Sequence, residues 1–105
     1  MKSMKFALPV LAVLVPVFSL AFADGNVVKG KALFNDEHFA GGKAGRSCNS
    51  CHPGGQGLEN AADRKDLETM VNKCIVGALK GNAIEAESSD MADMVAYIRS
   101  LQHKK

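Results

Sequence analysis

The chain has 105 residues, with 13 Lys and Arg against 11 Asp and Glu, and its formal net charge is +2 at pH 7. Two of the basic residues, Lys2 and Lys5, lie in an apolar N-terminal segment, so residues 24–105 carry nearly balanced charge and lack the strong positive field expected of a nucleic-acid-binding protein. This length allows one small domain. The hydrophobic core of such a domain gives only marginal stability unless another element, such as a cofactor, stabilises the fold.

Residues 1–23 have the features of an export signal. Lys2 and Lys5 precede an apolar run at residues 6–20, and Ala21-Phe22-Ala23 provides a small-x-small cleavage site. The run is short for a membrane span, which needs about 20 residues. We therefore predict a signal peptide at 1–23 that is cleaved after Ala23, a single domain at 24–105, no stable membrane span after cleavage, and a periplasmic location.

The first predicted helix spans residues 27–37, with Asn26 or Asp24 as its N-cap. A glycine-rich loop follows at residues 41–57 and contains the sequence CNSCH at positions 48–52. No segment alternates as a strand does. The expected fold class is therefore all-α, with three or four helices and glycine-rich loops.

Two further helices are predicted after this loop. One begins near Asp63, because acidic residues favour a helix N-terminus, and ends at Gly77 or Gly81. Its apolar residues recur at helical spacing on one face: Leu67, Met70, Val71, Cys74, Ile75 and Ala78. The last helix begins at a Ser88 or Ser89 cap. Its apolar face consists of Met91, Met94, Val95, Ile98 and Leu101.

The most specific feature of the chain is the pair Cys48 and Cys51 with His52 directly after it. This is the spacing for covalent haem attachment. Each thiol can add across one haem vinyl group, and the histidine that follows can place its imidazole on the iron. We therefore predict one covalent haem c, attached through Cys48 and Cys51, with His52 as the proximal iron ligand. An attached haem would also stabilise a domain with so small a core.

Other interpretations of the motif are weaker. A structural zinc site needs four ligands, and after His52 the chain offers only Cys74 and His103 as further nitrogen or sulfur ligands. A thioredoxin-type pair would lie in a βαβ pattern, which the sequence lacks. A structural disulfide between Cys48 and Cys51 would not need His52.

Together with the motif, two helix signatures resemble those of class I c-type cytochromes. They are GKALF at residues 30–34 and MVAYIRSL at residues 94–101. The resemblance implies a small cytochrome c fold around one covalent haem, with the first and last helices crossing at Gly30, Phe34 and Tyr97. Tyr97 could equally be an ordinary core aromatic. The resemblance also implies a periplasmic monohaem one-electron carrier whose partners are other redox proteins.

The sequence departs from this family at the sixth iron ligand. Typical relatives carry a Met-Pro dipeptide before the last helix, but the loop at residues 77–85 contains no methionine. Residues 71–101 resemble the Cys-ligated haem domains of thiosulfate dehydrogenases and of the thiosulfate-oxidising cytochromes, which implies Cys74 as the distal ligand. A spare thiol in an oxidising compartment is also reactive unless it is protected. The alternatives for Cys74 are an inert core residue and an intermolecular disulfide.

Other side chains compete for the sixth position. Met70 lies one turn before Cys74 on the same face, and Met94 is the next alternative; both are also ordinary core residues. Asn72 and a bis-histidine arrangement through His38 or His103 are remoter possibilities. If Cys74 is the ligand, a second function is possible, in which the chain is a haem domain or subunit for the oxidation of sulfur compounds. A weak sixth ligand would instead suit a gas-binding or sensory haem. A single haem motif and scattered arginines favour the electron carrier over an enzyme.

Overall fold

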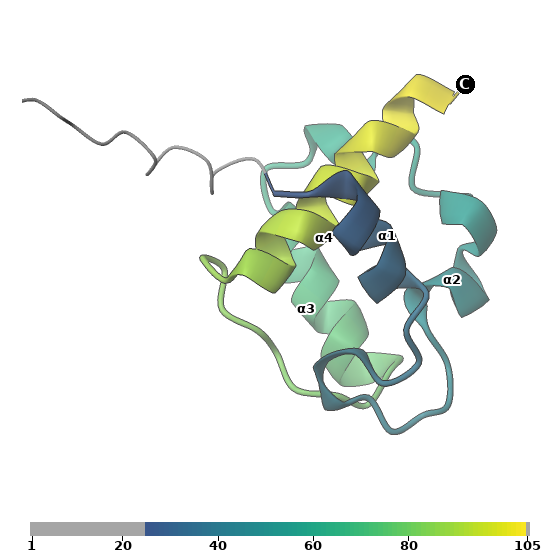
Figure 1. Cartoon of the computed structure of the whole chain (residues 1–105), viewed down its shortest axis with the longest axis vertical. Helices are drawn as coiled ribbons and strands as arrows, with labels where there is room; N and C mark the ends of the chain where they lie inside the picture. Colours follow the sequence, from purple (N-terminus) through teal and green to yellow (C-terminus); the bar gives the residue numbers. More distant parts are fainter. Residues whose placement is uncertain (1–24, 105) are drawn as a thin grey trace, which may run out of the picture.

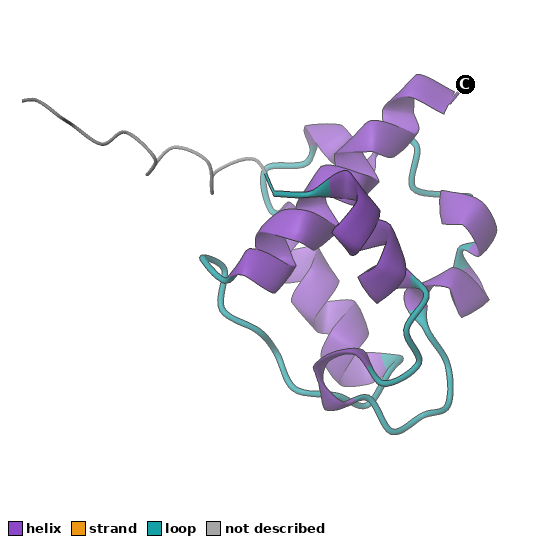
Figure 2. Ribbon diagram, in the orientation of Figure 1, coloured by secondary structure: helices purple, strands orange, loops and turns teal. Residues whose placement is uncertain are grey.

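The computed structural model describes residues 25–104, which form helices joined by loops without any strand (Figure 2). The α-helices are α1 (Val27–Phe34), α2 (Cys48–Cys51), α3 (Leu67–Gly77) and α4 (Ser89–Ser100). Short 3-10 turns are η2 (Phe39–Gly41), η3 (Pro53–Gly55), η4 (Ala61–Asp63) and η5 (Leu101–Lys104). The prediction of an all-α fold class is confirmed for these residues. The predicted signal peptide lies outside them.

Helices α1 and α4 cross in direct contact (Figure 1). Gly30 makes the crossing possible, because a Cβ at this position would overlap the carbonyl oxygen of Asp93. The rings of Phe34 and Tyr97 meet edge to face, with centroids 5.0 Å apart. Asp93 also accepts a hydrogen bond of 2.7 Å from the Asn26 N–H, which ties the start of α1 to α4. The predicted crossing of the first and last helices is confirmed.

Helix α1 has the predicted start but a different end. Its N-cap is Asn26, whose side chain accepts from the Lys29 N–H at 2.9 Å. The predicted end at Glu37 is wrong, since the helix stops at Phe34. Asn35 terminates it, because both its backbone N–H and its side-chain amide donate to the Lys31 carbonyl, at 3.1 and 2.8 Å.

Helix α3 begins later than the sequence predicts. Asp63 ends the η4 turn instead of starting the helix, and Arg64 then takes an extended conformation (φ −73°, ψ 135°) before α3 begins at Leu67. The predicted end at Gly77 is confirmed. The apolar face divides into two rows. One row is buried in the core and consists of Leu67, Val71, Ile75 and Leu79, the last just beyond the helix. The other row consists of Met70, Cys74 and Ala78.

Helix α4 provides the largest part of the core. Ser88 is its N-cap and accepts from the Met91 N–H at 3.1 Å, as predicted. All the predicted apolar residues of this helix are buried. Asp93 and Tyr97 are buried as well, on the side that meets α1. No helix among residues 25–104 combines the length and the apolar character needed to cross a lipid bilayer.

Candidate functional site

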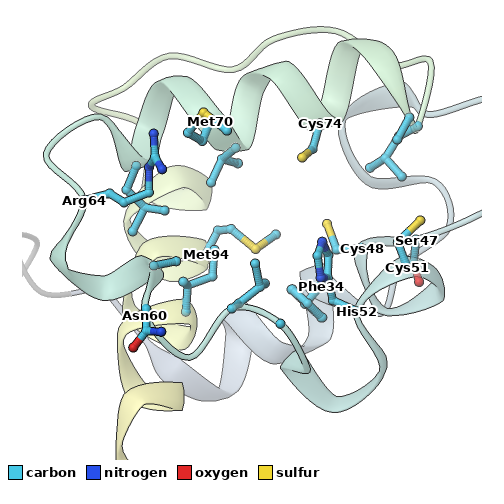
Figure 3. Close-up of a pocket in the computed structure, with 18 residues that line it drawn as sticks. Phe34, Ser47, Cys48, Cys51, His52, Asn60, Arg64, Met70, Cys74 and Met94 are labelled. Carbon is cyan, nitrogen blue, oxygen red and sulfur yellow. The ribbon is translucent and has the colours of Figure 1, made fainter.

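A cavity of about 520 Å³ lies between α2, α3 and α4 (Figure 3). Its size falls within the roughly 300–1,000 Å³ typical of ligand and cofactor sites. Most of the side chains on its wall are apolar. They include Phe34, Leu67, Val71, Leu79, Met94 and Ile98. Because these residues also belong to the core, the cavity opens directly onto the centre of the domain.

Both cysteines of the CxxCH motif line this cavity. They occupy the first and last positions of α2, and residues three apart lie on the same face of a helix. Cys48 contacts the hydrophobic core, whereas Cys51 is exposed, and both are free thiols. Burial, followed by the nearby Cys74 thiol, raises the pKa of Cys48 to about 11, so this sulfur is a neutral thiol at pH 7.

The short helix α2 is fixed at both ends by its own side chains. The Ser47 N–H donates to the Ser50 hydroxyl at 2.9 Å, and Ser47 is buried. The Asn49 side-chain carbonyl accepts from the Gly54 N–H at 2.8 Å, which joins α2 to the η3 turn. These bonds hold the two cysteines and the residue after them in a defined arrangement.

His52 follows α2 directly and lines the same cavity. Its backbone N–H donates to the Cys48 carbonyl at 2.9 Å, and its ring Nδ1 lies 3.0 Å from the Gln56 carbonyl oxygen. A carbonyl oxygen can only accept, so Nδ1 carries the hydrogen. The other ring nitrogen, Nε2, then has the lone pair that a metal ligand needs. The Gln56 carbonyl is thus the group that orients the His52 ring.

Helix α3 places sulfur atoms on the same cavity. In Figure 3 the Cys74 side chain projects from α3 towards the part of the cavity that holds His52 and Cys48. Met70 lines the cavity one turn earlier, but its sulfur stays close to α3. Met94 reaches the cavity from α4 and is fully buried. The structure therefore brings all three sequence-predicted candidates for the sixth ligand to one cavity.

Two of the remoter candidates, Asn72 and His38, are not on the cavity wall. The Asn72 amide bonds to the backbone of Ile84 through both its oxygen and its nitrogen. His38 is on the surface, and its side chain is 89% exposed. The side chain of His103 is outside the described part of the structure. Neither Asn72 nor His38 is placed opposite His52 by a described contact.

Two polar residues at the cavity were missed by the sequence analysis. Arg64 and Asn60 line it close to the η4 turn. Asp66 holds the Arg64 guanidinium through two hydrogen bonds, of 2.8 and 2.9 Å. The hydrogen bonds that the Arg64 guanidinium donates to Asp66 raise the pKa of Arg64 above its ordinary value and lower the pKa of Asp66. The two groups are therefore both charged at pH 7.

The residues on the cavity wall fit a covalently attached haem. An apolar cavity suits the face of a porphyrin, two thiols that could form thioether bonds line it, and the His52 Nε2 is free to bind iron. Within residues 25–104, no three His, Cys, Asp or Glu side chains gather into a metal-binding group. A porphyrin supplies four nitrogens itself, so the protein needs to contribute only the axial ligands.

Comparison with known proteins identifies no relative of this chain. No family model, no curated protein and no solved structure matches the chain. The function of the site is therefore argued from its own geometry.

Proposed function

We propose that this chain is an exported monohaem c-type cytochrome that carries one electron at a time. The observation that carries the proposal is the meeting of Cys48, Cys51 and His52 on one wall of an apolar cavity of about 520 Å³. The motif alone predicts attachment. The cavity adds a space of suitable size and apolar character at the place where the tetrapyrrole would be attached.

In this proposal Cys48 and Cys51 each form one thioether bond. The sulfur of each thiol bonds to one carbon of a vinyl group and its hydrogen goes to the other carbon, so the addition needs no oxidant. The four-residue helix α2 sets the separation of the two sulfurs. The same helix delivers His52 to the cavity directly after the second attachment point.

His52 and Cys74 are the proposed axial ligands. The hydrogen bond from His52 Nδ1 to the Gln56 carbonyl, at 3.0 Å, holds the ring and leaves Nε2 to bind the iron. Cys74 is the proposed ligand from α3, because its side chain projects towards the part of the cavity that holds His52 (Figure 3). Met70 and Met94 line the same cavity and are the alternatives.

A bound haem supplies the ferric and ferrous states between which one electron is exchanged. The chain's own residues control access to it. Cys51 is exposed and lines the cavity, so the cofactor edge joined to it would lie close to solvent and to a redox partner protein. The buried part of the wall, which includes Phe34 and Met94, would keep water from the part of the cofactor that packs against it.

Mass spectrometry of the exported protein tests the proposal. We expect the mature chain to carry the added mass of one haem when it is produced in a host that attaches haem to exported proteins. Replacement of both Cys48 and Cys51 by Ala is expected to abolish the added mass, whereas Cys74→Ser is expected to keep it. Recovery of a folded wild-type chain with no tetrapyrrole would overturn the proposal.

A second candidate function is the oxidation of a sulfur anion at a haem ligated by His52 and Cys74. The observation that favours it is the exposure of Cys74 at the cavity, where a dissolved anion could reach the sulfur. Arg64 adds a cation to the same wall. Against it, Arg64 is the only Lys or Arg among the described residues that line the cavity.

Thiosulfate separates the two functions. A carrier is expected to exchange electrons rapidly with a second cytochrome and to show no change in its absorption spectrum on addition of thiosulfate or sulfite. Steady reduction of the haem by thiosulfate, lost in Cys74→Ser, would favour the enzyme instead.

A further inference from the structure

One end of the cavity carries a charged side chain that the proposed attachment of haem does not use. Arg64 lines the cavity, and in Figure 3 it lies at the end far from Cys48 and Cys51. It reaches this place because the chain leaves the η4 turn in an extended conformation at Arg64 instead of continuing as a helix. The interruption between η4 and α3 therefore brings a guanidinium to an otherwise mostly apolar wall.

Asp66 fixes this guanidinium from one side only. Arg64 Nε donates to one carboxylate oxygen at 2.8 Å and Nη2 donates to the other at 2.9 Å. A guanidinium has five N–H donors in a rigid plane, so three of them remain, two on Nη1 and one on Nη2. No other hydrogen bond of this group to residues 25–104 is present. Both side chains are half exposed, so the pair by itself contributes little to stability.

The ionisation of Asp66 supports this arrangement. The hydrogen bond from Arg64 is the main cause that lowers the pKa of Asp66, and Lys73 contributes in the same direction. The carboxylate therefore stays charged at pH 7 and keeps the guanidinium oriented. An arginine held along one edge by a carboxylate presents its remaining N–H groups in a fixed direction, which is how arginine binds a second anion.

The chemistry of haem identifies that anion. On the porphyrin ring the two vinyl groups that react with cysteine lie on one side, and the two propionate groups lie on the other. If the vinyl carbons were attached to Cys48 and Cys51, the propionates would lie towards the far end of the cavity. A carboxylate beside an apolar wall needs a cation or several hydrogen-bond donors. We propose that Arg64, oriented by Asp66, binds a propionate carboxylate of the haem. This inference rests on the proposed function.

Asn60 is a second polar residue at the same end of the cavity. It lines the cavity, and its side-chain amide makes no hydrogen bond to another described residue. It lies at the start of the η4 turn, four residues before Arg64. The two side chains therefore come from the two ends of one short turn and lie at the same end of the cavity.

Two properties of the haem-loaded protein test the inference. Arg64→Gln removes a positive charge next to the cofactor, which disfavours the reduced state, so we expect a lower midpoint potential. The equilibrium constant for reduction of the haem is expected to fall roughly threefold to tenfold. We also expect the propionate bending band in the resonance Raman spectrum to shift, because its hydrogen-bond donor is gone. Arg99→Gln, on the exposed side of α4, changes the net charge equally and is the control; both properties are expected to stay close to wild type.

Asp66→Asn provides an independent test if Arg64→Gln yields no loaded protein. It removes a negative charge behind the guanidinium, so the midpoint potential is expected to rise, the opposite of the Arg64 effect. Asp63→Asn, also exposed and close in sequence, is its control. If both substitutions shift the potential no more than their controls and leave the propionate band unchanged, the inference is overturned while the haem remains attached. Absence of haem from the wild-type protein would instead overturn the proposed function.

Discussion

Gly57 lies against the imidazole ring of His52. A Cβ at position 57 would stand 3.3 Å from His52 Nδ1, the atom that donates to the Gln56 carbonyl. Gly57 also has a φ of +92°, a conformation that other residues rarely adopt. The loop after the CxxCH motif therefore holds the His52 ring from two sides, with a hydrogen bond on one and a glycine that leaves just enough space on the other.

Gly57→Ala is predicted to disturb the orientation of His52. The added methyl group presses on Nδ1 and weakens the bond to the Gln56 carbonyl, so Nε2 becomes a poorer donor to ferric iron and the midpoint potential rises. Gly54→Ala is the matched control, because Gly54 also has a positive φ, of 64°, but has nothing within 4 Å of its Cβ position. Both variants are expected to lose about 1 kcal/mol of unfolding free energy from backbone strain. Equal potentials for the two variants would contradict the prediction.

Cys74→Ser is predicted to change the absorption spectrum of the oxidised protein and to raise its midpoint potential. A thiolate donates charge to ferric iron, so its removal favours the reduced state. Met70→Leu, on the same row of α3, is expected to leave both properties unchanged. Optical redox titration of the two variants measures the effect. Met94→Leu is measured as a third variant. If the spectrum changes only in Met70→Leu, the sixth ligand is Met70, and if it changes only in Met94→Leu, the sixth ligand is Met94.

The helices were predicted best where the periodicity of apolar residues is long. The predicted last helix has five apolar residues at helical spacing, and all of them are buried, four in α4 and Leu101 at the start of η5. The ends of the other helices depend on local hydrogen bonds and backbone conformations, which the spacing of apolar residues does not predict. Asn35 stops α1 by bonding to the Lys31 carbonyl, and the extended conformation of Arg64 delays α3 until Leu67. Asp93 is buried because α1 offers it the Asn26 N–H, a contact between residues far apart in the sequence.

In the candidate site, too, the part formed by neighbours in the sequence could be predicted, and the part formed by folding could not. Cys48, Cys51 and His52 are adjacent in the sequence, so their spacing alone predicts their shared placement on one cavity wall. The partner of His52 Nδ1 is a backbone carbonyl, which every residue has, and nothing in the identity of Gln56 marks it. Arg64 looks like one of several scattered arginines until the turn before α3 places it at the cavity.

Asn72→Ala is predicted to destabilise the haem-loaded protein without altering its spectrum. The Asn72 side chain accepts from the Ile84 N–H at 2.8 Å and donates to the Ile84 carbonyl at 2.9 Å. These two bonds hold the segment between α3 and α4, and their loss is expected to lower the unfolding free energy by about 1–3 kcal/mol. Asn35→Ala removes one exposed side-chain bond and is expected to cost less. Urea titration measures both; a changed spectrum in Asn72→Ala would instead indicate that Asn72 acts at the iron.

Gly30→Ala is predicted to be the most damaging of the small substitutions, because the new methyl group would overlap the Asp93 carbonyl and lie 2.8 Å from the Tyr97 Cβ. Both neighbours belong to α4, so the methyl group can be accommodated only if α1 and α4 move apart, at a cost of about 1–3 kcal/mol or more. Gly77→Ala is the matched control: it lies in α3 with nothing within 4 Å of its Cβ position. Since alanine favours a helix more than glycine does, this control is expected to gain up to about 0.5–1 kcal/mol. Thermal or urea unfolding of the two variants therefore should show shifts of opposite sign. Similar stability for both would mean that the α1–α4 crossing does not depend on the close approach at Gly30.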